Sequence, residues 1–125
     1  MSTLEAVMTT QEVANRFNEL AQANQWDQIQ SELFAENASS LEPQDSPGLQ
    51  SVMGLSAIKE KGKKFAEMVE EMHGGYTSAP VVGGRFFSLA MGMDCTMKGM
   101  GRQKMDEIAV YEVKDGKIVR EQFFY

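Results

Sequence analysis

Two glutamates near the end of the chain occupy positions where carboxylates could carry out acid–base chemistry. Glu107 and Glu121 each lie in a segment whose side chains alternate in the manner of a β-strand. Aromatic side chains share the same faces of these segments: Tyr111, Phe123 and Tyr125. Carboxylates that share an apolar cavity raise one another's pKa, which is typical of acid–base sites. The competing interpretation places Glu107 and Glu121 near a rim, paired with Lys104 or Arg120 and without a chemical role.

The only histidine and the only cysteine are the next candidates. His73 is the one side chain that ordinarily titrates near neutral pH, and at a junction between a helix and a strand it fits either a structural role or that of a general base. Cys95 has no basic neighbour on its own face and is interpreted as a small buried apolar residue. The sequence contains neither a zinc motif nor a phosphate-binding glycine loop, so we expect no metal and no cofactor.

Residues 85–98 form the segment with the clearest alternation. Every second residue is apolar or contains sulfur: Phe87, Leu89, Met91, Met93, Cys95 and Met97. The residues between them are smaller and more polar, so we expect the first set to face the interior. Methionine is flexible and polarizable, and a wall of methionines fills irregular space or accepts irregular apolar ligands. The pattern therefore leaves two interpretations open, a plain core and a methionine-lined ligand cavity.

The elements that would position these residues follow from the hydrophobic pattern. A period of 3.6 residues indicates helices over residues 9–23, 26–33 and 56–72. A period of two indicates strands over residues 38–42, 76–82, 85–98, 102–113 and 117–125. Short glycine-containing connections between the last four strands favour an antiparallel meander. Helices followed by a run of strands indicate an α+β fold rather than an alternating α/β fold.

Charge and composition exclude several classes of function. The chain has 125 residues and a net charge of −6, which disfavours binding to nucleic acid or to an anionic membrane. Four lysines are clustered in the predicted third helix and are interpreted as a solvated helix face: Lys59, Lys61, Lys63 and Lys64. The length fits a single domain over residues 1–125, the N-terminus does not resemble a signal peptide, and the lone Cys95 fits a reducing compartment. We therefore expect a cytoplasmic protein.

The order of several short motifs resembles a known superfamily. The bend 24–27 between two helices is followed by residues 33–38, by a strand that ends in Glu42-Pro43, by a helix start at 54–58 and by the closing hairpin 111–119. This order is similar to that of the NTF2-like superfamily, and within it to the SnoaL-like group that includes ketosteroid isomerases and polyketide cyclases. The resemblance covers residues 9–125. It implies a cone in which three N-terminal helices pack inside a strongly curved antiparallel β-sheet, and a homodimer formed through the outer face of that sheet.

The resemblance also implies site residues. The base of the ketosteroid isomerases stands immediately before a proline, and that position is Glu42 here. Their two oxyanion donors fall on Phe17 and Ala109, neither of which can donate a hydrogen bond. Because an enolate would form without these donors, we do not expect steroid isomerase activity.

The sequence thus predicts a small-molecule-binding protein with two alternatives for its role. In the first, it catalyses cofactor-independent isomerisation, cyclisation or dehydration with Glu42 as base and His73, Glu107 and Glu121 as weaker candidates. An apolar ligand would then contact six side chains: Phe17, Met91, Met93, Tyr111, Phe123 and Tyr125. In the second, it is a non-catalytic dimeric module that binds a ligand or a protein partner.

Overall fold

The computed structural model describes residues 7–46 and 48–125. The N-terminal residues on which the signal-peptide prediction rests lie outside this part of the chain. The described residues form three helices: α1 (Thr10–Gln22), α2 (Trp26–Leu33) and α3 (Leu55–Met68). They also form seven strands: β1 (Phe34–Leu41), β2 (Val52–Met53), β3 (Val69–Thr77), β4 (Val81–Gly83), β5 (Phe86–Met97), β6 (Gly101–Lys114) and β7 (Lys117–Phe124).

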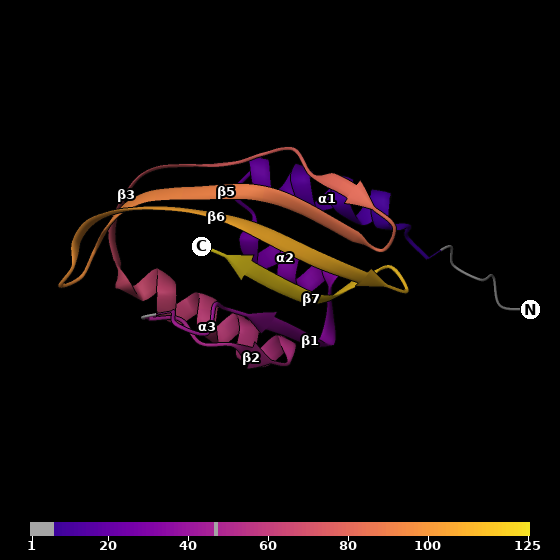
Figure 1. The fold of residues 1–125 in the computed structure, drawn as a ribbon, viewed down its shortest axis with the longest axis horizontal. Helices are drawn as coiled ribbons and strands as arrows, with labels where there is room; N and C mark the ends of the chain where they lie inside the picture. Colours follow the sequence, from indigo (N-terminus) through magenta and orange to yellow (C-terminus); the bar gives the residue numbers. More distant parts are fainter. Residues whose placement is uncertain (1–6, 47) are drawn as a thin grey trace, which may run out of the picture.

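One curved sheet holds all the strands together. Its order is β2-β1-β7-β6-β5-β3, with β4 paired to β5. The pairings are antiparallel except that β1 and β7 run parallel, so the sheet is mixed. In Figure 1 the sheet bends so that β5 and β6 lie above β1 and β2, with α2 between α1 and α3. The predicted α+β cone is therefore confirmed. No helix in the described part of the chain is both long and apolar enough to span a membrane.

Local sequence signals explain why the main elements begin and turn where they do. Thr9 and Glu12 form a capping box at the start of α1, since each side chain accepts a hydrogen bond from the other residue's backbone N–H. The turn between β6 and β7 places Asp115 and Gly116 at positive φ, as a two-residue hairpin turn requires. Both features agree with the elements predicted around them.

Three predicted elements differ from the structure. The strand predicted over residues 76–82 is divided between the end of β3 and β4. The first strand begins at Phe34 rather than at Ala38, because α2 passes directly into β1 without a loop. The third helix ends at Met68, and the segment from Val69 to Thr77 pairs with β5 as a strand. Met72, the last residue of the predicted helix, is 53% exposed on β3. Pairing with β5 overrides the weak helical period of this segment.

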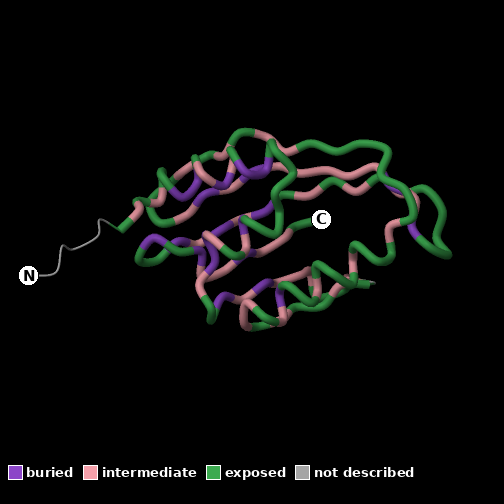
Figure 2. The backbone as a smooth tube through the Cα atoms, turned by 180° about the vertical axis from the view of Figure 1, so that it is seen from behind, coloured by how far each residue is buried: buried purple, intermediate pink, exposed green. Residues whose placement is uncertain are grey.

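The packed core is concentrated in one part of the molecule. In Figure 2 the buried backbone gathers near α1, α2 and the β6–β7 turn, whereas the β5–β6 turn at the far end is exposed. Four aromatic side chains, here called the aromatic cluster, fill this core: Phe17, Phe34, Phe87 and Tyr111. The ring centroids of Phe17 and Tyr111 are 4.7 Å apart, and Phe87 stacks on Tyr111 at 4.9 Å. Such contacts add to the stabilisation from burial alone.

Candidate functional site

The register of three strands brings three glutamates to the inner face of the sheet. Glu121 on β7 pairs with Tyr111 on β6 and with Ser40 on β1. Side chains alternate between faces along a strand, so Glu107 shares the inner face with Tyr111, and Glu42 shares it with Ser40. We call Glu42, Glu107 and Glu121 the carboxylate cluster. Its members lie on the same face as the aromatic cluster. Glu107 lies towards the other end of β6, whereas Glu121 lies directly across from Tyr111.

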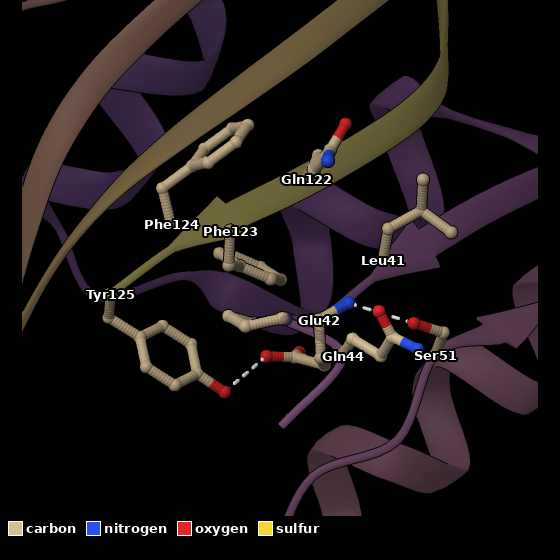
Figure 3. Close-up of a pocket in the computed structure, with 9 residues that line it drawn as sticks. Leu41, Glu42, Gln44, Ser51, Gln122, Phe123, Phe124 and Tyr125 are labelled. Atoms are coloured by element: carbon tan, nitrogen blue, oxygen red, sulfur yellow. Dashed lines mark hydrogen bonds between the residues drawn. The ribbon is translucent and has the colours of Figure 1, made fainter. Parts of the chain in front are cut away.

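Glu42 is held from several directions. It directly follows β1, and its backbone N–H donates to the Ser51 hydroxyl at 2.9 Å. Its side chain is only 3% exposed. The Lys61 ammonium donates to Glu42 Oε2 at 2.7 Å, and the Tyr125 hydroxyl donates to Glu42 Oε1 at 2.8 Å. Figure 3 shows the Glu42 carboxylate and the Tyr125 hydroxyl pointing towards each other. The carboxylate is therefore fixed in one orientation.

Lys61 connects Glu42 to the rest of the inner face. Its side chain is 14% exposed, and its ammonium donates a second hydrogen bond to the Ser40 hydroxyl at 2.8 Å. The same ammonium lies 5.6 Å from the centroid of the Phe123 ring. The prediction that Lys61 belongs to a solvated helix face is wrong. Lys61 turns inward because α3 packs on β1, and its long side chain reaches from the helix to the buried Glu42 carboxylate.

Glu121 is buried as a whole residue, with 7% exposed, whereas Glu42 and Glu107 are partly buried as whole residues. Burial raises its pKa from 4.5 to about 7, and the negative charge of Glu42 acts in the same direction. A hydrogen bond from Ser40 and the positive charge of Lys61 oppose this rise. Arg120, considered as its partner, pairs with Glu112 instead at 3.4 Å. Glu121 therefore holds a proton up to near-neutral pH.

Glu107 also has a raised pKa, and burial is again the main cause. Partial burial raises its pKa from 4.5 to about 7, and the charges of Glu42 and Glu121 add to this rise. The ammonium of Lys61 lowers it only in part. Across the strand pair, Glu107 faces Met91 on β5, so its neighbour on that side is apolar. Two acids that titrate near neutral pH beside a third, ion-paired carboxylate form an arrangement suited to proton transfer.

An open pocket lies where β1 and β7 end. Its volume is about 440 Å³. Nine residues line it: Leu41, Glu42, Pro43, Gln44, Ser51, Gln122, Phe123, Phe124 and Tyr125. In Figure 3, Phe124, Gln122 and Leu41 lie on one side of the strands, and Phe123 lies on the other side with Glu42 and Tyr125. The pocket therefore extends around the end of the sheet and reaches Glu42.

The other residues predicted to contact a ligand lie at different depths. Phe17 and Tyr111 are 1% and 2% exposed within the aromatic cluster. Met91 and Met93 are partly buried on the inner face of β5 and do not line the pocket. Of the six predicted contact residues, the structure brings Phe123 and Tyr125 to the pocket beside Glu42.

His73 and Cys95 lie away from Glu42. His73 is on β3, which stands at the opposite end of the strand order from β1, and its Nε2 lies 2.7 Å from the Thr96 hydroxyl. Cys95 is buried on β5, and burial raises the pKa of its thiol. Among the described residues, no three His, Cys, Asp or Glu side chains are placed to hold a metal ion.

Sequence reasoning missed two participants, Lys61 and the loop residue Ser46. Ser46 Oγ lies 2.7 Å from the Tyr125 hydroxyl and donates to it, because Tyr125 donates its single hydroxyl proton to Glu42. A helical wheel of α3 could have found Lys61, because it lies three residues after the buried Ile58 and shares its face. Nothing in the sequence places Ser46 next to residue 125.

Comparisons with known proteins agree with this geometry. A family model described as the SnoaL-like domain matches residues 8–125. A protein from Mesorhizobium loti assigned as a SnoaL-like polyketide cyclase is 34% identical, with a TM-score of 0.87 over 94% of this chain and 100% of that chain. No curated protein sequence gives a significant match.

Two further solved structures share the fold at low identity. An NTF2-like protein from Burkholderia thailandensis is 14% identical, with a TM-score of 0.78 over 94% of this chain and 90% of that chain. TerC, co-crystallised with polyporic acid, is 16% identical, with a TM-score of 0.71 over 93% and 90%. Together with the family match over residues 8–125, these likenesses show that the chain belongs to the SnoaL-like family and has the NTF2-like fold.

Proposed function

We propose that this protein binds a small apolar molecule and transfers a proton on it, with Glu42 as the base. The observation that carries the proposal is the Glu42 carboxylate, which is 3% exposed, held by Lys61 and Tyr125, and placed at the wall of a pocket of about 440 Å³. A pocket of this size holds a small ligand, and a buried, oriented carboxylate is a suitable base.

The proposed step is abstraction of a proton from a carbon next to a carbonyl group. The C–H bond breaks, an O–H bond forms on Glu42, and the electron pair moves to the carbonyl oxygen. Return of a proton to a different carbon completes an isomerisation. In a dehydration, the enolate instead expels a hydroxyl group from the neighbouring carbon, and an acid protonates that group so that it leaves as water. Glu107 and Glu121, whose pKa values are about 7, serve as acids in the second half of the reaction.

The ligand would lie against the pocket wall and extend along the inner face. Phe123 and Tyr125 would contact it beside Glu42, and Met91 and Met93 would line its path towards β5. Phe17 and Tyr111 would form the floor. TerC, which shares the fold, was crystallised with polyporic acid, and this agrees with a cyclic apolar ligand carrying polar groups.

Steroids are not the substrates that we propose. Phe17 and Ala109, which occupy the positions of the two oxyanion donors of ketosteroid isomerases, are 1% and 0% exposed and have no polar side-chain atom. An enolate at that depth would lack hydrogen bonds. The reacting carbonyl should therefore lie nearer to Lys61 and Tyr125, at the mouth of the cone.

Deuterium exchange tests the proposal without knowledge of the natural substrate. We choose 2-tetralone, an apolar ketone with acidic protons next to its carbonyl, and follow their replacement in D₂O by proton NMR. The wild type should accelerate exchange, and Glu42→Gln should slow it by about 100-fold or more. Glu36→Gln, at an exposed position of β1, is the matched control and should exchange like the wild type. Equal rates in Glu42→Gln and the wild type would exclude Glu42 as the base.

A second candidate is a non-catalytic dimeric module, favoured by the absence of both oxyanion donors. Its interface would be the outer face of the sheet, where Tyr76, Ile108 and Phe124 are 52%, 46% and 49% exposed. We propose a homodimer through this face in either case. Ile108→Asp should then give monomers in sedimentation, whereas Met68→Asp, at a position of α3 that is 38% exposed, should not. Binding of 2-tetralone without any exchange would favour the non-catalytic role.

A cytoplasmic location stays a prediction from the lone Cys95.

A further inference from the structure

The three acids of the carboxylate cluster are not equivalent, because only one of them has a cation as its direct partner. Lys61 Nζ is 2.7 Å from Glu42 Oε2. Among the described residues, neither Glu107 nor Glu121 forms an ion pair within 4.0 Å. The single ammonium of the inner face thus lies on the side of the cluster formed by β1 and α3.

The hydrogen-bond partners and burial of each acid further separate Glu42 from Glu107 and Glu121. Glu42 accepts hydrogen bonds on both oxygens, from Lys61 and from the Tyr125 hydroxyl, and both donors favour its ionised form. Glu121 faces Tyr111 on β6 and Ser40 on β1, which are neutral. Burial of such an acid without a cation favours its protonated form. Glu107 faces Met91 on β5 and the charges of the other two acids, which also favour a bound proton.

We propose that Lys61 is a positioning residue that keeps Glu42 ionised as the base and leaves the bound proton of the cluster on Glu107 and Glu121. The inference rests on the proposed function, since it assigns the roles of base and acid within the same site. Lys61 acts through Glu42 and need not contact the substrate. Removal of its ammonium would let Glu42 take up a proton and lose the capacity to accept one from carbon.

The assignment gives a balanced proton cycle. Ionised Glu42 takes a proton from the substrate carbon, and a protonated Glu107 or Glu121 gives one to the substrate at a second atom. After the step, Glu42 holds a proton and the donor acid is ionised. One proton lost from Glu42 to water and one gained by the donor acid restore the starting state. No oxidant, reductant or co-substrate is required.

Carbon-13 NMR of protein labelled at the glutamate carboxyl carbon tests the inference directly. Spectra of Glu42→Gln, Glu107→Gln and Glu121→Gln assign the three signals by their absence. In the wild type, the Glu42 signal at pH 7 should be that of the ionised form, while the Glu107 and Glu121 signals change near pH 7. In Lys61→Met, the Glu42 signal at pH 7 should move towards that of the protonated acid.

Three controls separate this role from a merely structural one. Lys64→Met removes an exposed lysine from the same helix and should leave the Glu42 titration unchanged. Lys61→Arg keeps a cation, and its Glu42 signal should be that of the wild type. The acidic limb of the pH profile for 2-tetralone exchange should move with the Glu42 signal in Lys61→Met, whereas a loss of stability alone would lower the rate at every pH.

The outcomes that overturn the inference are specific. If the Glu42 signal of the wild type at pH 7 is that of the protonated acid, Lys61 does not set the roles, and this result comes from the unaltered protein. An unchanged Glu42 titration in folded Lys61→Met would overturn it equally. Failure of the proposed function is a separate result, because 2-tetralone would then show no exchange while the carboxyl signals could still be read.

Discussion

The inner face of β6 and β7 changes character from one end to the other. Near the β6–β7 turn, Tyr111 packs in the aromatic cluster with Phe17 and Phe87, and these three side chains are at most 2% exposed. Four residues earlier on β6, Glu107 lies with Glu42 in the carboxylate cluster. The two regions share strands and the same face of the sheet, but α1 supplies Phe17 to the first and α3 supplies Lys61 to the second. They differ in what burial does to the free energy of unfolding.

The aromatic cluster gains stability from burial, and the carboxylate cluster loses it. Transfer of an aromatic ring from water to the core is favourable, whereas transfer of a carboxylate is unfavourable unless it is paired or protonated. Glu42 is paired with Lys61, but Glu121 has no cation as a direct partner and takes up a proton near pH 7. A region that lowers stability in this way is typical of a functional site.

The largest effect should come from the aromatic end. Phe17→Ala removes a ring that contacts both Phe87 and Tyr111. We expect the free energy of unfolding to fall by about 4 kcal/mol, from lost burial and from the cavity that remains. Urea denaturation at pH 7 measures it. Deuterium exchange per folded molecule should weaken, because Phe17 forms the floor of the proposed ligand path, but it should not disappear, because Glu42 stays in place. A complete loss of exchange in the folded variant would contradict the separation of the two regions.

A smaller loss should follow disruption of the one ion pair in the carboxylate cluster. Lys61→Met leaves the buried Glu42 carboxylate without its cation and should reduce the free energy of unfolding by about 3 kcal/mol at pH 7. The double variant Glu42→Gln/Lys61→Met should recover most of this loss, because no buried charge remains. Urea denaturation of both variants checks the expectation. Additive losses in the double variant would show that the pair is not coupled.

Glu121 should make stability fall as the pH rises. Its pKa of about 7 in the folded protein is above the ordinary value of 4.5, so folding favours the protonated form. The stabilisation is complete below pH 4.5 and is lost as the pH rises through 7, with a total of at most about 3 kcal/mol. Glu121→Gln should reduce this slope between pH 5 and pH 8 and be more stable than the wild type at pH 8. Identical slopes would contradict a raised pKa.

The smallest effect should come from the edge of the pocket. Tyr125→Phe removes the hydrogen bonds of the phenol hydroxyl to Glu42 and Ser46 but keeps the ring. Because Tyr125 is 55% exposed, we expect a loss of only about 1 kcal/mol in the free energy of unfolding. Exchange of 2-tetralone should slow several-fold through poorer orientation of Glu42. A Tyr125→Phe variant that exchanges like the wild type would show that Lys61 alone orients the base.

The fold could be predicted because its signals are local. The capping box at Thr9, the alternation on β5 and the Asp115-Gly116 turn each specify an element without knowledge of its neighbours. The segment from Val69 to Thr77 could not be assigned in the same way, because its strand conformation comes from pairing with β5. The sequence of this segment has a weak helical period, and no local signal in it indicates a strand.

The site could be predicted only in part for the same reason. Strand phase placed Glu107 and Glu121 on the inner face, and the resemblance placed Glu42. The contact between Glu42 and Lys61 joins the end of β1 to α3, and no periodicity encodes a distance between two elements. The sequence therefore presents Lys61 as one of four similar lysines, while the structure distinguishes it by burial and by its partner.

The most direct test of the account is the position of bound 2-tetralone, determined in a crystal structure of the complex. The account predicts the ketone against Phe123 and Tyr125, with the carbon next to its carbonyl within contact distance of the Glu42 carboxylate. A ketone bound on the outer face of the sheet, or in the surface groove between α2 and α3, would contradict the claim that the carboxylate cluster is the working end of the cone.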